Sequence, residues 1–174
     1  MIRKWNIVLF VAFFAFSLVS CKAEKVEQKS IEKEDSLSST NSKVEAQDYQ
    51  PGEWLVNYSQ ALELAEEYKK PILINFTGSD WCIWCKRLSK EVFSEKDFID
   101  YARENLILLK LDFPKSIQQS SEEKRQNESL ANQFGIQGFP TILILDSKGK
   151  EIARTGYQPG GSEQYVKHLR SLIK

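Results

Sequence analysis

Hydrophobic and polar positions from residue 51 onward predict alternating helices and strands. Nearly continuous apolar runs are typical of strands covered on both faces, whereas apolar residues on one face at helical spacing indicate helices against a sheet. The predicted strands are 72–76, 106–113, 141–145 and 151–157. The predicted helices cover 57–69, a segment from 82 to about 103 with a second start at 94–97, 120–134 and 160–173. This order predicts an α/β fold, with a mixed β-sheet flanked by helices on both faces.

Local signals support several of these boundaries. Asn57 or Ser59 can cap the first helix, and Pro71 ends it. A glycine follows the helix that begins near Ser120, as is common after a helix C-terminus. The turn sequence at 146–149 predicts a hairpin, which makes 151–157 an antiparallel edge strand.

Composition limits the classes of function. The 174 residues contain 24 Lys and Arg and 24 Asp and Glu, so the chain has no net charge. Nucleic acid is therefore an unexpected partner, because phosphate binding needs a basic surface. Three cysteines are too few for a disulfide-stapled mini-protein, so the fold must rest on an apolar core.

The N-terminal segment has the pattern of an export signal. Arg3 and Lys4 precede an apolar run over 7–19, which is short for a membrane span and suits a signal-peptide core. The run ends in Leu-Val-Ser-Cys21, which resembles the bacterial lipobox. We therefore predict a lipoprotein signal peptide over 1–20 and lipid on Cys21. An ordinary cleaved signal or an uncleaved anchor is the alternative, and each of these predicts export.

A flexible charged tether is predicted over 21–50, followed by a folded domain over 51–174. The tether is rich in Lys, Glu, Ser and Gln, and it has too little apolar surface to offset the entropy of ordering. Its few apolar residues hold no sustained period, so it offers no coiled-coil seam. We therefore expect a monomer.

The candidate chemistry is the sequence Trp81-Cys82-Ile83-Trp84-Cys85-Lys86, placed between a predicted strand and a predicted helix. Two cysteines at this spacing can form a disulfide at the start of a helix, and such a pair is typical of a redox centre. The alternative is a structural disulfide. A loop of about four residues removes only about 2 kcal/mol of unfolded-state entropy, against about 4.7 kcal/mol for a loop near 100 residues. The redox interpretation is therefore preferred.

Together with the step Phe139-Pro140-Thr141, this motif resembles the thioredoxin superfamily. The resemblance covers roughly 54–174 and rests on W-C-x-x-C-K, the order of elements, and a proline that opens the strand after the third helix. The stretch 76–82 has one more residue between strand and cysteine than thioredoxin has. In this it resembles exported Dsb-type reductases, which include the C-terminal domain of DsbD and small reductases of chlamydiae.

The resemblance implies roles for the motif residues. Cys82, at a helix N-terminus, would be the attacking nucleophile, and Cys85, one turn later, the buried resolving thiol. Pro140 would be cis and would turn the Phe139 backbone toward the cysteines to pair with substrate. No cofactor beyond the Cys82–Cys85 couple is implied.

The tryptophans and the single histidine have two interpretations each. Trp81 and Trp84 could contact substrate or could simply pack; we expect Trp81 to pack partly under the site and Trp84 to be exposed. His168 lies on the last predicted helix, so a zinc site would have three ligands at best. We predict no metal site.

One position departs from the thioredoxin pattern. Thioredoxin carries a buried aspartate before the motif that is thought to take the proton of the resolving cysteine, and the matching residue here is Asn75. Asparagine cannot accept a proton. Asp80 is expected in the loop, so water or another carboxylate, such as Glu91, stays open as the acceptor.

Three functions compete: a protein-disulfide reductase, a disulfide oxidase or isomerase, and a tethered non-catalytic binding module. The reductase is favoured, because Ile83-Trp84 lacks the histidine typical of oxidants of the DsbA kind, and no dimerisation segment of an isomerase is present. By resemblance, the partners would be exported proteins with disulfides and a DsbD-like membrane electron donor. The expected location is the bacterial periplasm, on a membrane through the Cys21 lipid or soluble after ordinary cleavage.

Overall fold

The computed structural model describes residues 49–173. The predicted signal peptide 1–20, Cys21 and the predicted tether up to residue 48 lie outside the described residues. None of the helices within 49–173 is long and apolar enough to cross a lipid bilayer.

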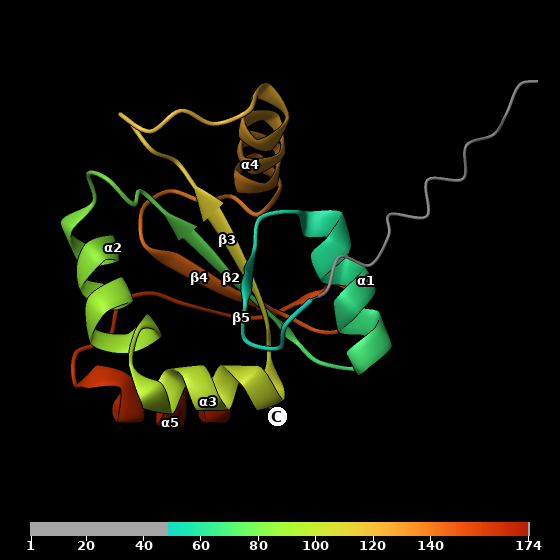
Figure 1. Cartoon of the computed structure of the whole chain (residues 1–174), viewed down its shortest axis with the longest axis vertical. Coiled ribbons are helices and arrows are strands. Elements are labelled where there is room, and N and C mark those ends of the chain that lie inside the picture. The colour runs from blue at the N-terminus through green and yellow to red at the C-terminus, as the bar shows by residue number, and fades with distance from the viewer. Residues whose placement is uncertain (1–48, 174) are drawn as a thin grey trace, which may run out of the picture. The chain divides into compact units, whose positions relative to one another are not determined.

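Five strands form one mixed sheet in the spatial order β1-β3-β2-β4-β5 (Figure 1). The strands are β1 (Trp54–Leu55), β2 (Ile72–Thr77), β3 (Ile107–Asp112), β4 (Thr141–Leu145) and β5 (Glu151–Thr155). β3 pairs in parallel with both β1 and β2, whereas β4 is antiparallel to β2 and to β5. β2 and β3 therefore end at the same edge at which β4 begins, and the candidate site lies there.

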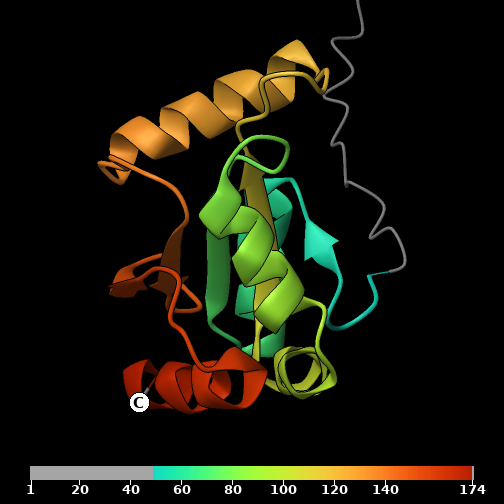
Figure 2. The same cartoon turned by 90° about the vertical axis from the view of Figure 1, so that its left-hand side faces the viewer.

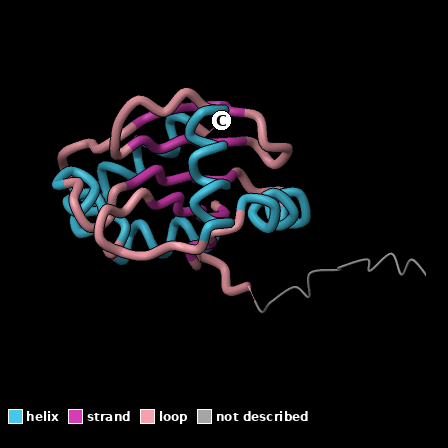
Figure 3. The backbone as a smooth tube through the Cα atoms, turned by 90° about the horizontal axis from the view of Figure 1, so that it is seen from above, coloured by secondary structure: helices cyan, strands magenta, loops and turns pink. Residues whose placement is uncertain are grey.

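Helices cover both faces of the sheet (Figure 3). They are α1 (Tyr58–Tyr68), α2 (Ile83–Leu88), the π-helical turn η1 (Ser89–Phe93), α3 (Lys96–Asn105), α4 (Ser121–Gln133) and α5 (Gly161–Leu172). α2, η1, α3 and α5 contribute to one buried cluster, and α1 and α4 contribute to the other. We call these two sides the α2 face and the α1 face; Figure 2 looks onto α2 in front of the strands.

The strands divide their side chains between the two faces by simple alternation. In β2, Ile72, Ile74 and Phe76 belong to the cluster on the α1 face, while Leu73 belongs to the cluster on the α2 face. The parallel register pairs Asn75 with Lys110. Because these two residues alternate with the α1-face positions, both lie on the α2 face.

The predicted fold class is confirmed, and most element boundaries agree within two residues. Asn57 caps α1 by accepting a hydrogen bond from the Gln60 N–H at 3.0 Å, and the Ser120 hydroxyl accepts one from the Glu123 N–H at 3.1 Å. The short strand β1 was not predicted, because two residues carry no periodic pattern. Its pairing with β3 depends on a partner about 50 residues away.

Candidate active site: the Cys82–Cys85 disulfide

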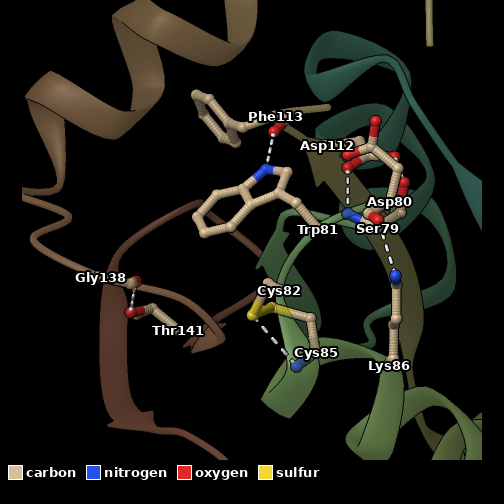
Figure 4. Close-up of a disulfide and its surroundings, with 10 residues drawn as sticks. All are labelled: Ser79, Asp80, Trp81, Cys82, Cys85, Lys86, Asp112, Phe113, Gly138 and Thr141. Atoms are coloured by element: carbon tan, nitrogen blue, oxygen red, sulfur yellow. Dashed lines mark hydrogen bonds between the residues drawn. A yellow bond between two sulfur atoms is a disulfide. The ribbon is translucent and has the colours of Figure 1, made fainter. Parts of the chain in front are cut away.

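The two motif cysteines lie where the β2–α2 turn enters α2 (Figure 4). Cys82 is the N-cap residue of α2 and is joined to Cys85 by a disulfide, with 5.2 Å between their Cα atoms. The Cys85 backbone N–H donates to Cys82 Sγ at 3.1 Å. Unpaired N–H groups at a helix start favour negative charge, so this position suits a Cys82 thiolate.

The tight turn before Cys82 begins at Gly78, where a side chain would meet the Trp81 indole. The backbone N–H groups of Trp81 and Cys82 both donate to the Gly78 carbonyl, at 3.3 and 2.8 Å. A Cβ atom on Gly78 would lie 2.5 Å from Trp81 Cε2, well inside contact distance. The absence of a side chain at Gly78 therefore lets the Trp81 indole fold back over the turn.

Trp81 is held beside the disulfide by three contacts. Its indole N–H donates to the Phe113 carbonyl at 2.8 Å (Figure 4). Its ring meets the Phe139 ring edge-on at 5.8 Å between centroids. The Lys115 ammonium lies 4.3 Å from the centre of the indole ring, within cation–π range. The side chain is nevertheless 41% exposed, so it packs along one edge and offers the remainder to solvent.

Trp84, between the cysteines, is 49% exposed, and two neighbouring side chains contact its ring. The Arg87 guanidinium lies 5.1 Å from its ring centre, and the Tyr157 ring lies at 5.4 Å. Glu91 ties these two neighbours together: it accepts from the Tyr157 hydroxyl at 2.6 Å and pairs with Arg87 at 3.2 Å. The hydrogen bond to Glu91 raises the pKa of Tyr157. Glu91 thus has a role in supporting Trp84.

Phe139 and Pro140 lie at the start of β4, and the peptide bond between them is cis. Phe139 packs against both Trp81 and Phe113, with 5.1 Å between its ring centre and that of Phe113. Thr141, the first residue of β4, donates its hydroxyl to the Gly138 carbonyl at 2.7 Å. The structure therefore brings Phe139 and the Trp81 side chain together, although 57 residues separate them in the sequence.

The β2–α2 turn is pinned by two carboxylates. Asp112 accepts from the Ser79 N–H at 3.0 Å and from the Ser79 hydroxyl at 2.6 Å. Asp80 accepts from the backbone N–H groups of Lys115 at 3.0 Å and Ser116 at 2.6 Å. Burial raises the pKa of Asp80, but the N–H groups of Ser116 and Lys115 outweigh it and hold the pKa below its ordinary value. The Lys86 ammonium donates to the Asp80 backbone carbonyl at 2.6 Å.

A polar cavity of about 370 Å³ opens on the α2 face next to Cys85. Its lining includes Asn75, Cys85 and Lys110, and Glu91 is not part of it. Lys110 and Asp112 were not singled out in the sequence analysis. A signal existed: 110 and 112 interrupt an apolar strand at alternate positions, in register with Asn75 and Thr77.

His168 lies on α5 and shares a hydrogen bond of 2.9 Å with the Thr155 hydroxyl of β5. No group of three or more His, Cys, Asp or Glu side chains arranged to hold a metal ion occurs among residues 49–173.

Comparison with known proteins places this fold and site in a class. The sequence profile of the family described as a thioredoxin-like domain matches residues 58–172, and the chain belongs to this family. Within it, the chain is 36% identical over 118 residues to the disulfide bond reductase DsbH of Chlamydia pneumoniae, covering 68% of this chain and 71% of that protein. A solved structure of a DsbH oxidoreductase superposes with a TM-score of 0.67, covering 70% of this chain and 83% of that one. The predicted similarity to Dsb-type reductases is confirmed.

A more distant relative is the thiol:disulfide interchange protein DsbD of Yersinia pestis. The identity is 31% over 111 residues, which cover 62% of this chain and only 17% of DsbD. This chain therefore corresponds to a small part of that protein. The common feature of these relatives is thiol–disulfide oxidoreductase chemistry, and Cys82–Cys85 is the cysteine pair that can perform it here.

Proposed function

We propose that this protein is a reductase of disulfides in exported proteins, with Cys82 as nucleophile and Cys85 as resolving thiol. The observation that carries the proposal is the Cys82–Cys85 disulfide at the N-terminus of α2, where a backbone N–H already donates to Cys82 Sγ. The name of the relative DsbH, a disulfide bond reductase, supports the direction of electron flow.

The reduced protein would act in two exchange steps. The Cys82 thiolate attacks a substrate disulfide, which forms a mixed disulfide and releases one substrate thiolate. The Cys85 thiolate then attacks Cys82 Sγ, which forms the Cys82–Cys85 bond and releases the second substrate thiolate. Two electrons pass from the cysteine pair to the substrate, and no other cofactor takes part.

The exposed aromatic side chains around the pair would receive the substrate. Trp84 and the free edge of Trp81 flank the disulfide, and Phe139 lies against Trp81. Amphipathic rings of this kind give large contact area for little conformational entropy. The Phe139 backbone before Pro140 would pair with an extended substrate segment.

Serine variants of the two cysteines test the mechanism. We expect Cys82→Ser to abolish reduction of insulin disulfides, and Cys85→Ser to accumulate a mixed disulfide that is visible on a non-reducing gel. Full insulin reduction by Cys82→Ser would exclude this mechanism. A non-catalytic binding module would instead keep its partners in both variants without any dependence on thiols.

The reduction potential of the pair decides the direction. Equilibration with defined thiol buffers should give a value near that of thioredoxin, about −270 mV, rather than that of DsbA, about −120 mV; the interval corresponds to about 7 kcal/mol. A value near −120 mV would make the protein a disulfide donor and would overturn the reductase.

The proposed location is the periplasm, with the domain tethered to a membrane through lipid on Cys21. A tether raises the effective concentration of a domain near a membrane partner. The proposed electron donor is a DsbD-like membrane protein, in line with the similarity to DsbD. Labelling of cells with a radioactive fatty acid should mark the wild-type protein and leave Cys21→Ser unlabelled.

A further inference from the structure

The polar cavity next to Cys85 connects a buried thiol position to solvent. Its inner wall consists of the buried Asn75, Thr77 and Cys85, and its outer wall consists of exposed side chains of α2, η1 and the turn that follows. The complete lining is Asn75, Thr77, Ser79, Cys85, Lys86, Ser89, Lys90, Ser94 and Lys110. Every side chain in this set other than Cys85 is polar, so the cavity can admit water.

The charge in this lining is positive. Lys86 and Lys90 enter from α2 and η1, Lys110 enters from β3, and no carboxylate is part of the lining. Asp112 stands outside this lining; it accepts two hydrogen bonds from Ser79 and forms an ion pair with Lys110, with 3.9 Å between its carboxylate and Lys110 Nζ.

Asn75 gives a second, independent indication of a hydrated site. Its side chain is only 7% exposed, and its carboxamide oxygen accepts no hydrogen bond from residues 49–173. A buried acceptor without a partner is unfavourable by about 1–3 kcal/mol. Solvent that enters the cavity can donate to it at the point where Cys85 must release a proton.

We propose that this cavity is the exit path for the Cys85 proton, and that Lys110 is the positioning residue whose charge favours the Cys85 thiolate. This inference rests on the proposed reductase function. In this inference, water takes the proton that a buried carboxylate takes in thioredoxin, and the Lys110 charge stabilises the thiolate that remains. Glu91, the carboxylate considered from the sequence, is bound to Tyr157 and Arg87 outside the cavity.

In the mixed disulfide, the Cys85 S–H bond breaks and its proton passes to water in the cavity. Cys85 Sγ attacks Cys82 Sγ; the Cys82–Cys85 bond forms, and the bond from Cys82 to the substrate sulfur breaks. The electron pair leaves with the substrate sulfur, which takes up a proton from solvent. The cysteine pair is oxidised and the substrate is reduced.

Lys110 lines the cavity together with Cys85, whereas its ion-pair partner Asp112 lies outside the lining. A cation near a thiol favours the thiolate, whereas a carboxylate at the same place opposes it. The side chain of Lys110 is 41% exposed, so its influence is moderated by solvent. We therefore expect an effect of about tenfold in the fraction of Cys85 thiolate, the change that one pKa unit produces.

The experiment uses the reduced protein and the aromatic disulfide DTNB, whose leaving thiolate absorbs visible light. Attack by Cys82 releases the first equivalent, and resolution by Cys85 releases the second, so stopped-flow absorbance separates the two steps. We expect Lys110→Met to slow the second phase about tenfold near pH 7 and to move its pH midpoint upward, with little change in the first phase.

Three further variants make the test specific. Lys110→Arg should restore the wild-type pH profile, and Asn75→Asp should move the midpoint upward with Lys110 intact. Lys167→Met, which removes a surface lysine paired with Glu163 on α5, should match the wild type. Circular dichroism verifies that each variant is folded.

The outcomes separate the two proposals. The role of the Lys110 charge would be overturned if folded Lys110→Met kept the wild-type rate and pH midpoint of the second phase, or if Lys110→Arg slowed that phase as much as Lys110→Met does. Neither result would contradict the proposed reductase function. If the reduced wild-type protein released neither equivalent of thiolate from DTNB, the proposed function itself would be contradicted.

Discussion

The two faces of the sheet differ at the point where β2 and β3 end. On the α1 face, both strands stay apolar to their last α1-face positions, Phe76 and Leu111, which are fully buried. On the α2 face, the same strands begin apolar at Leu73 and Leu108 and then become polar. The polar positions are Asn75, Thr77, Lys110 and Asp112.

This difference assigns separate tasks to the two sides of one strand end. The apolar side continues into a group of aromatic rings. The centroid of the Phe76 ring lies 6.4 Å from the ring centroids of both Phe113 and Phe134. Phe113 in turn supports Phe139 and accepts the Trp81 N–H. The polar side borders the cavity at Cys85. Aromatic packing thus borders the site on one face, and the polar cavity borders it on the other.

The largest expected effect is on the apolar side. Phe76→Ala should lower the free energy of unfolding by about 3–5 kcal/mol, because it removes a fully buried ring and leaves a cavity among other rings. Urea denaturation followed by tryptophan fluorescence measures this change. A loss below about 1 kcal/mol would show that the aromatic group does not anchor the strand ends.

The matched control is the neighbouring residue on the other face. Leucine has a shape similar to that of asparagine, and Asn75→Leu removes an acceptor that has no hydrogen-bond partner among residues 49–173. We therefore expect the free energy of unfolding to change by less than about 1 kcal/mol. A loss as large as that of Phe76→Ala would mean that the two faces do not differ in the way described.

The smallest expected effect concerns Asp80, in the turn between β2 and α2. Its pKa is lowered in the folded state, so its contribution to stability is present above its unfolded pKa of about 3.9 and is lost as pH falls through the lower folded value. Thermal unfolding of wild type and Asp80→Asn should therefore differ at pH 7 and converge below about pH 3. A difference that persists unchanged at pH 2 would contradict the role of the Asp80 charge.

The sequence predicted the fold well because the relevant signals are local. Continuous apolar runs, the caps at Asn57 and Ser120, and the turn at 146–149 each act within a few residues. The candidate site was predicted only as far as its motifs reached, namely Trp81, Cys82, Trp84, Cys85 and the Phe139-Pro140 step. The contacts of Trp84 with Tyr157, and of Tyr157 with Glu91, join segments more than 60 residues apart and had no sequence signal.

By itself, the sequence determined the α/β class, the cysteine pair at a helix start and the absence of a carboxylate at position 75. Only the tertiary structure decided what stands near that asparagine. Parallel pairing of β2 with β3 places Lys110 opposite Asn75, and α2 lies over them so that Cys85 borders the same cavity. The physical reason is that strand register and helix packing depend on burial summed over the whole core, whereas motifs and caps depend on neighbours in the chain.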